Sequence, residues 1–373
     1  MTANLYGSDS KFSDSQLWQI NKSSGYNGQN LQFVYWSNFD GDINFTLLPV
    51  SYGLNNTYGP GAYIVASESA QGNKIGLYDL TDDLGNNPEM IYYEITVPAY
   101  EVGSDAFQRG TTCKLSINDC RALSGFYLNG IVHFVHAAKR PDEWNGIHYY
   151  RVNVGNRTAT KGSFGLEDYD YAYPSIASYA TTTTGKSAMI KFARSAADDY
   201  PETRVVHVDD NFNWSGSTYV KGLWEVECFS GNDVQRWGDY SGICRNYSMN
   251  APSVLVAGAH GNFDGEWESH AAEVHDSGPV ANRDVKDEVK LVVWPNPVQK
   301  RISFTFQAPE TGLAKVICTS EDGTIIKELL KSTAQLGENT FSMNTEGLVS
   351  GVYILSIVQN QQILANEKIV IQH

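Results

Sequence analysis

The chain has 373 residues, of which 42% are hydrophobic and 12% aromatic, so it can form two domains with a substantial core. Its net charge of −15 argues against binding to nucleic acid or to anionic membrane surfaces, because both attract basic patches. The 33 glycines and 22 tyrosines, with few helical patterns, favour an all-β protein. No apolar run approaches the about 18 residues that span a bilayer, so no membrane insertion is expected.

Five similar hairpins follow one another along residues 1–275, each with an apolar strand, a polar turn and a second strand of alternating character. The paired segments are 1–6 with 16–20, 62–67 with 74–80, 130–136 with 146–152, 187–192 with 203–208, and 253–257 with 266–272. Repetition of such hairpins at a long period is typical of a β-propeller and is less expected in a large sandwich. We therefore predict a β-propeller over residues 1–275.

The first hairpin lacks the preceding residues that supply further strands to the later ones. Met1 already lies inside a predicted strand, and residues 1–6 have neither the basic start nor the apolar centre of a signal peptide. We therefore expect the propeller to be incomplete at its N-terminus, with one or more blades upstream of Met1.

The five cysteines include no Cys-x-x-Cys pair, so a structural zinc site is not expected. Cys113 with Cys120, and Cys228 with Cys244, could each close a short loop by a disulfide, which would fit an oxidising compartment. Buried free thiols are the alternative for these four residues. Cys318 is expected to be a buried free thiol.

Several groups resemble metal or catalytic sites only superficially. The stretches 40–42 and 209–211 could offer oxygen ligands to calcium, but neither has EF-hand spacing, and Asp-rich turns explain them. His133 and His136 are three residues apart, so on a strand they point to opposite faces. There is no phosphate-binding glycine loop and no Ser/His/Asp elbow. We expect no cofactor, no metal site and no assigned catalytic residue.

Two tracts of charged and aromatic residues, 167–173 and 236–240, could contact a glycan. In the second, Arg236 and Asp239 could line a central channel. Alternatively, Asp239 caps a turn, Arg236 pairs with a neighbouring carboxylate and Trp237 packs between blades. In the first, the tyrosines could stack on sugars or bind a cation, or they could lie half-buried between blades. We favour the structural interpretation of both tracts.

Residues 276–290 are polar, with glycine, proline and charges, and they predict a linker. Residues 291–373 then alternate short apolar runs with turns, as in a small antiparallel sandwich. The prolines at 295 and 297 impose an extended, non-helical start. After Gly351 a strand should alternate between two faces, with Val352, Ile354 and Ser356 on one and Tyr353, Leu355 and Ile357 on the other.

Residues 291–373 resemble the type IX secretion system sorting domain (type A) of Bacteroidota. The residues that carry the resemblance are Pro295, Asn296, Pro297, Gly351, Val352, Tyr353, Lys368, Ile369 and Val370. The resemblance implies an immunoglobulin-like sandwich that is recognised by an outer-membrane translocon and its shuttle protein. In many members a sortase cuts before the domain and links the passenger to surface lipopolysaccharide. Here that cut would fall in residues 276–290.

Residues 1–275 look like the sialidase-type (BNR-like) propeller passengers of such proteins. The motifs that carry this likeness are residues 119–121, 126–130, 173–176 and 236–242. A retaining sialidase needs an arginine cluster, a tyrosine nucleophile and separate carboxylates. The arginines available are Arg121, Arg194, Arg204, Arg236 and Arg245. The Ser-x-Asp-x-Gly-x-x-Trp box of sialidases is absent, so the ingredients do not amount to a site.

We therefore expect a secreted cargo of the type IX system, displayed at the cell surface or released. Its passenger is expected to be a non-enzymatic module for adhesion or glycan binding, because propellers expose loops around a channel. The partners expected are the translocon, the shuttle protein, a sortase and a surface glycan. The alternatives are a surface glycoside hydrolase of sialidase type and a structural component of the cell-surface machinery.

Overall fold

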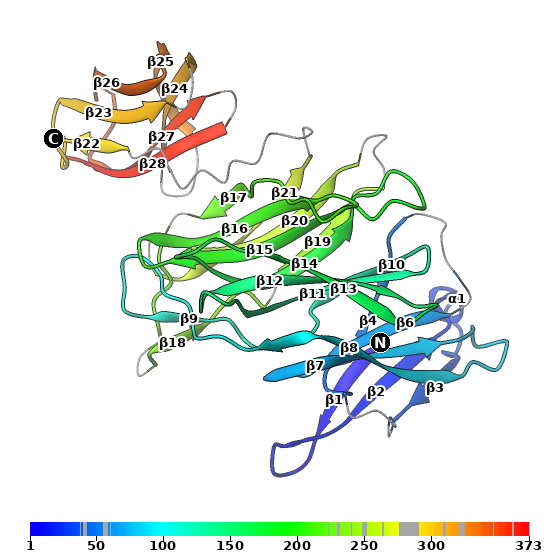
Figure 1. Ribbon diagram of the computed structural model, residues 1–373. Coiled ribbons are helices and arrows are strands. Elements are labelled where there is room, and N and C mark those ends of the chain that lie inside the picture. Colours follow the sequence, from blue (N-terminus) through cyan, green and yellow to red (C-terminus); the bar gives the residue numbers. More distant parts are fainter. Residues whose placement is uncertain are drawn as a thin grey trace. The chain divides into compact units, whose positions relative to one another are not determined.

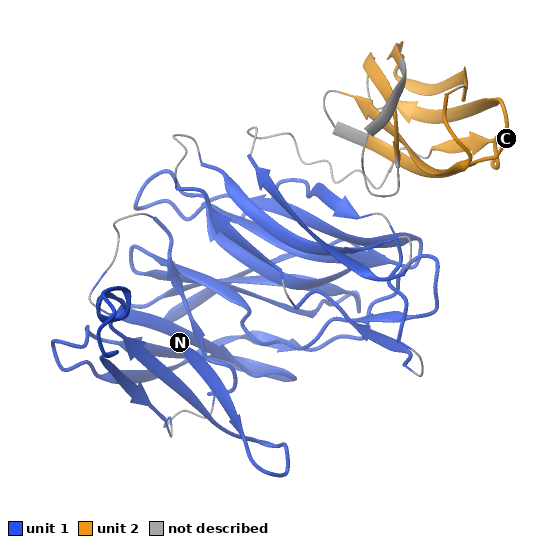
Figure 2. Cartoon of the chain, turned by 180° about the vertical axis from the view of Figure 1, so that it is seen from behind, with its two compact units in different colours: residues 1–283 blue, residues 284–373 orange. Residues whose placement is uncertain are grey.

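The computed structural model describes residues 1–37, 39, 43–54, 59, 61–222, 224–229, 232–239, 241–247, 252–262, 265–275, 291–308, 311–320, 325–345, 347–359 and 362–372. The chain divides into two compact units, residues 1–283 (unit 1) and 284–373 (unit 2), which are coloured separately in Figure 2. The predicted linker, residues 276–290, lies outside the described residues, as do residues 40–42 and Tyr240.

Unit 1 is built from β-sheets and one short helix, α1 (Lys22–Tyr26). The first sheet has the order β1 (Thr2–Tyr6), β2 (Phe12–Ile20), β3 (Phe33–Trp36), and the second has β4 (Leu48–Pro49), β6 (Ala62–Ser67), β7 (Gln71–Leu80), β8 (Met90–Glu101). The third sheet has β13 (Thr158–Phe164), β12 (Asn145–Asn153), β11 (Ile131–Lys139), β10 (Ser124–Leu128), β5 (Ser51–Tyr52).

The fourth sheet has the order β14 (Asp170–Ser178), β15 (Ala188–Ala196), β16 (Asp199–Val208), β17 (Thr218–Gly222), and the fifth has β19 (Gly242–Arg245), β20 (Val254–Gly261), β21 (Trp267–Val274). A separate parallel pair joins β9 (Lys114–Ser116) to β18 (Val234–Arg236). All five predicted hairpins are confirmed as antiparallel pairs: β1–β2, β6–β7, β11–β12, β15–β16 and β20–β21. Asn129 and Gly130, both at positive φ, make the tight turn between β10 and β11.

The five large sheets of unit 1 pack on one another in chain order, from the blue β1–β3 to the yellow-green β19–β21 in Figure 1. Apolar clusters fill the four successive interfaces, and each contains side chains from both sheets: Leu17 and Tyr78, Ile75 and Phe134, Ile147 and Phe192, and Val205 and Val256. An inner sheet is therefore covered on both faces. For this reason every residue of β14 and β15 is buried, whereas burial alternates along most of β20 in the outermost sheet.

The two outermost sheets each leave one face exposed. On the first sheet, Phe33 and Tyr35 are 55% and 56% exposed, and on the fifth, Leu255 and Trp267 are 45% and 51% exposed. Within the described part of the chain, no apolar cluster joins the first sheet to the fifth. The all-β class is confirmed. A closed propeller and blades upstream of Met1 stay predictions.

Unit 2 contains a three-stranded sheet and a four-stranded sheet. Their orders are β22 (Val292–Trp294), β23 (Arg301–Ala308), β26 (Gly337–Asn344) and β25 (Ile325–Ala334), β24 (Gly312–Ser320), β27 (Gly351–Gln359), β28 (Gln362–Ile371). Phe304 of the first sheet and Tyr353, Leu355 and Ile357 of the second share one core, so the sheets pack face to face. The predicted grouping of Tyr353, Leu355 and Ile357 on one face of β27 is confirmed, and that face points to the core. An immunoglobulin-like topology stays a prediction.

The disulfide in unit 1 differs from both predicted loops, and that prediction is wrong. Cys113 is bonded to Cys228, 115 residues away, while Cys120 is buried and Cys244 exposed without a disulfide. The parallel pairing of β9 with β18 brings the two partners together. Gln108 supports the same junction, because its Nε2 donates to the carbonyls of Cys113 and Val226, at 2.8 Å each. Cys318 is buried and not disulfide-bonded, as predicted.

Replacing Cys113 with serine should lower the free energy of unfolding of unit 1 by about 2–4 kcal/mol, because the disulfide closes a long loop of the unfolded chain. Urea unfolding followed by tryptophan fluorescence measures this change. Cys244→Ser is the matched control and should leave the unfolding midpoint unchanged. Equal midpoints for the two variants would contradict a stabilising role of the disulfide.

Candidate functional site

Three segments that the sequence analysis singled out lie side by side in unit 2. The register of β27 with β28 pairs Val352 with Val370 and Tyr353 with Ile369. Residues 296–298 run along the other side of β28, where the Val298 amide donates to the Val370 carbonyl at 2.7 Å. We call residues 295–298, 351–353 and 368–370 the C-terminal patch.

Asn296 joins the start of unit 2 to its last strand. Its Nδ2 donates to the Lys368 carbonyl at 2.8 Å, and the Val370 amide donates to its Oδ1 at 2.8 Å. The amide side chain thus offers one donor and one acceptor to β28, as a neighbouring backbone would. The peptide bonds before Pro295 and Pro297, on either side of it, are both cis. An asparagine is the side chain that can make both bonds at this reach.

The C-terminal patch has members that face the core and members at the surface. Tyr353 and Ile369 are buried, and the Tyr353 hydroxyl donates to the Val349 carbonyl at 2.9 Å. The surface members are the exposed residues 295–297 and the half-buried Val352, Lys368 and Val370. A partner protein can contact only this second group.

Sequence reasoning missed Val298. Val298 is fully buried, and its carbonyl accepts from the Gln372 amide at 2.9 Å, which continues the pairing begun by Asn296. The only sequence signal was an apolar residue directly after Pro297. Among the described residues, no strand lies beyond β28 in its sheet, so this segment covers part of an outer edge.

In unit 1, the five arginines considered for a substrate carboxylate lie in local pairs. Arg121 pairs with Asp119 (2.7 Å), Arg194 and Arg204 share Glu202 (2.5 and 3.1 Å), Arg236 pairs with Asp239 (2.5 Å), and Arg245 donates to the carbonyls of Ser178 and Ala180 (3.2 and 2.7 Å). Arg194 and Arg204 are the pair that shares a carboxylate among the described residues. The arrangement is that of separate structural ion pairs and not of one carboxylate-binding cluster.

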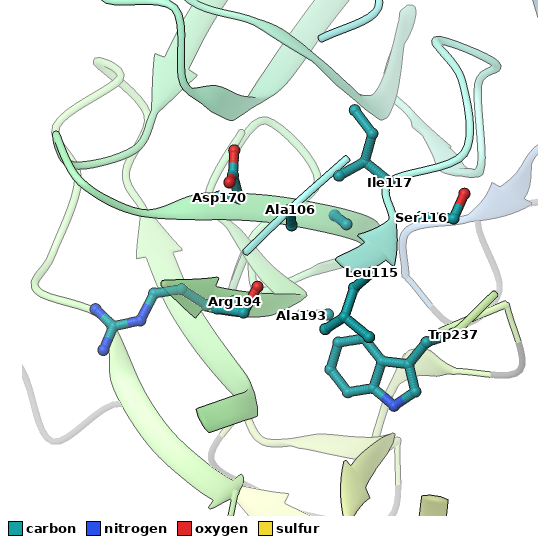
Figure 3. Close-up of a pocket in the computed structure, with 10 residues that line it drawn as sticks. Ala106, Leu115, Ser116, Ile117, Asp170, Ala193, Arg194 and Trp237 are labelled. Atoms are coloured by element: carbon teal, nitrogen blue, oxygen red, sulfur yellow. The ribbon is translucent and has the colours of Figure 1, made fainter. Parts of the chain in front are cut away.

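The described residues of the tract 236–240 pack against neighbouring strands and do not line a binding channel. Trp237 is buried against Leu115 and Tyr173, next to a cavity of about 10 Å³ that has room for little more than one water molecule. Figure 3 shows the Arg194 guanidinium pointing away from Leu115 and Trp237. A side chain at Gly238, whose φ is +95°, would come within 2.4 Å of the Tyr173 ring. Arg236 pairs with Asp239 itself, so the predicted carboxylate partner lies within the tract.

In the tract of residues 167–173, two tyrosines are more deeply buried than predicted. Tyr171 and Tyr173 are 0% and 3% exposed, so they offer no platform for a sugar. Asp170 accepts hydrogen bonds from the backbone and side-chain amides of Asn145 at 3.1 and 2.7 Å. Burial raises the pKa of Asp170, and these bonds oppose the rise. The Arg194 guanidinium lies 4.0 Å above the Tyr169 ring.

The remaining candidates have structural roles in the described chain. Asp209 accepts from the amides of Asn211 and Asn213 at 2.8 Å each, which is a turn of the predicted kind. His133 bonds the Tyr149 hydroxyl at 2.6 Å, whereas His136 lies on the opposite face of β11, 3.3 Å from the Tyr150 hydroxyl. The described residues contain no group of three or more His, Cys, Asp or Glu that could hold a metal ion.

The fold and the C-terminal patch therefore define unit 2 as a small two-sheet module. Residues 292–372 match the family described as the secretion system C-terminal sorting domain. The match supports the type IX sorting resemblance of this part of the chain. The type A class, the bacterial phylum and a sialidase-like passenger stay predictions. Among the described residues, no helix has the length and apolarity that crossing a membrane requires.

The whole chain has distant likenesses to solved structures. They include an exo-beta-1,3-galactanase from Phanerochaete chrysosporium (10% identity, 86% of this chain and 96% of that chain, TM-score 0.28), a GH43_12 from a capybara gut metagenome (12%, 87% and 88%, 0.24) and dimeric latent PorU from Porphyromonas gingivalis (9%, 91% and 35%, 0.19). These TM-scores are too low to support an argument about fold or function. No curated protein matches the chain.

Asn296→Ala should lower the free energy of unfolding of unit 2 by about 1–2 kcal/mol, because it removes two hydrogen bonds to β28. Hydrogen exchange at the Val370 amide should also accelerate, since that amide loses its acceptor. Both effects can be measured by exchange mass spectrometry during urea titration. Asn366→Ala, on an exposed position of the same strand, should change neither. Unchanged exchange at Val370 in Asn296→Ala would show that the side-chain bonds do not hold the strand.

Proposed function

We propose that the protein is a cargo of the type IX secretion system, exported across the outer membrane by unit 2. The observation that carries this proposal is the match of residues 292–372 to the sorting-domain family, at the same residues that build the C-terminal patch. In this proposal the outer-membrane translocon and its shuttle protein recognise and bind unit 2. The passenger, unit 1, is displayed at the surface or released.

The C-terminal patch suits recognition by a protein surface. It offers an extended segment, residues 295–297, next to the outward Val352 and Val370 and the Lys368 side chain. Conformation here is held by backbone pairing from Val298 and by Asn296. A partner would therefore meet a preformed surface and would not lose binding free energy by ordering it.

For the passenger, we propose a β-propeller that binds a ligand without chemistry. Its five sheets stack in chain order, and its arginines are held in local pairs. A sortase that cuts within residues 276–290 would separate this passenger from its sorting domain, unit 2. The sialidase-type alternative is not carried forward, because no specific contact among the described residues favours it.

Deleting residues 291–373 should abolish export, and fusing residues 276–373 to a reporter should restore export of that reporter. The physical reason is that the proposed export signal, unit 2, is a separate compact unit that can be moved to another protein. The measurement is the amount of each protein in the medium and at the surface of a type IX-competent cell, compared with the periplasm. Normal amounts of the truncated protein outside the cell would rule out unit 2 as the export signal. A structural role in the machinery predicts instead that deletion impairs export of other cargoes.

Lys368→Glu should reduce export of the reporter fusion by about tenfold, which corresponds to about 1.4 kcal/mol of recognition free energy. The change reverses a charge on the outer face of β28 within the C-terminal patch. Lys331→Glu, at an exposed position on β25, is the matched charge reversal outside the patch and should export normally. Circular dichroism of both purified modules checks that folding is retained. Equal export of the two variants would place the recognition surface elsewhere on unit 2.

A further inference from the structure

A groove of about 870 Å³ opens in unit 1 between the second and third sheets. Its walls come from the start of β7, the end of β8, and strands β11 to β13. Deeper in the same interface, the side chains of Val132, Phe134 and Tyr150 pack against the second sheet. The groove begins where this apolar packing gives way to polar residues. Its volume lies in the range of small-ligand pockets.

The floor of the groove is set by strand register. β12 places His148 opposite Ser163 of β13 and Tyr150 opposite Lys161, so all four side chains share the face that points to the second sheet. His148 is 3% exposed, and its Nδ1 has no hydrogen-bond partner among the described residues. Burial, with the nearby charges of Lys161 and Arg140, lowers the pKa of His148 to about 3. The imidazole is therefore neutral at physiological pH.

Lys161 is the cation of the groove that lacks a counter-ion. It is half-buried, and it makes no ion pair within the described part of the chain. By contrast, Lys139 is held by Glu143 at 2.6 Å and Glu101 at 3.3 Å. A half-buried ammonium without a partner is costly, and an anionic ligand would compensate it.

Arg140 belongs to the wall of the groove and is already satisfied. It pairs with Asp142, and its Nη1 donates to the Leu166 carbonyl at 2.9 Å. Of the three basic residues that line the groove, Lys161 is thus the one left for a ligand.

The facing wall offers hydrogen-bonding groups. Glu68, Gln71 and Asn73 line it, and Tyr100 is buried with its hydroxyl already bonded to the Glu68 amide and the Lys74 carbonyl, both at 3.0 Å. Carboxylate and amide side chains of this kind bind hydroxyl groups. A polyhydroxylated ligand finds donors and acceptors on both walls.

We propose that this groove binds an acidic saccharide, with a carboxylate of a uronate residue against Lys161 and Ser163 and sugar hydroxyls against Glu68, Gln71 and Asn73. The inference rests on the proposed role of unit 1 as a binding module and gives that module a ligand class. It is independent of export, which is measured on unit 2 fusions that lack the groove. Failure of one proposal can therefore be told from failure of the other.

The test is calorimetric titration of the full chain with a uronic-acid oligosaccharide, a neutral oligosaccharide of equal length, a sulfated one and oligoglutamate. The uronate should bind at least about tenfold more tightly than the neutral sugar, because a charge-assisted contact is lost in the latter. Lys161→Gln should cause the same loss, while Lys161→Arg should retain binding. Tighter binding of the sulfated sugar would support the acidic-saccharide site and assign its anionic group as a sulfate.

Two further variants separate the groove from general effects of charge. Ser163→Trp should abolish binding of every saccharide by filling the groove from an exposed position, and Lys11→Gln, at a distant surface lysine, should leave affinity unchanged. The proposal is overturned if the wild-type chain binds no acidic sugar, if Lys161→Gln binds as well as wild type, or if oligoglutamate binds more tightly than the uronate.

Discussion

Face-to-face packing of successive sheets is the constraint on which unit 1 depends. Each inner sheet is apolar on both faces and is stable only when two neighbouring sheets cover it. The sheets therefore pack on one another in chain order. Polar groups caught between sheets must then be satisfied internally. Arg151 illustrates this: its Nε donates to the Tyr149 hydroxyl at 2.9 Å and its Nη atoms donate to the carbonyls of Asp209 and Asp210. The Arg151 guanidinium is therefore held by structural contacts.

The same constraint explains where binding can occur. A groove forms where a sheet interface widens and polar side chains replace apolar ones, as at His148 and Lys161. Around Trp237 the interface stays closed, and the residual cavity of about 10 Å³ has room for little more than one water molecule. A charged residue near an interface therefore indicates a binding site only when its counter-ions are considered. Arg194 is neutralised by Glu202, whereas Lys161 has no counter-ion in the described chain.

Unit 2 depends on the same kind of packing on a smaller scale. Its two sheets share one core, and its first and last segments are joined by Val298 and Asn296. This closure turns three short segments, distant in the chain, into one patch. The buried Tyr353 and Ile369 maintain the patch, and residues 295–297 with Val352, Lys368 and Val370 form its accessible part. We have proposed export recognition for unit 2 and ligand binding for unit 1.

Local patterns in the sequence determined the all-β class, the five hairpins and the alternation of β27, because these depend on residue periodicity and on turn residues such as Asn129 and Gly130. A family resemblance singled out residues in all three segments of the C-terminal patch but missed Val298, and the role of these residues in export stays a prediction. The sequence could not show that Asn296 bonds Lys368 and Val370, that Cys113 pairs with Cys228, or that Lys161 lies beside His148 in a groove. Each of these is a contact between segments far apart in the chain, and only the packing and register of sheets decides which side chains meet. Burial of Tyr171 and Tyr173 was underestimated for the same reason: the neighbouring sheet that covers them leaves no trace in the local pattern.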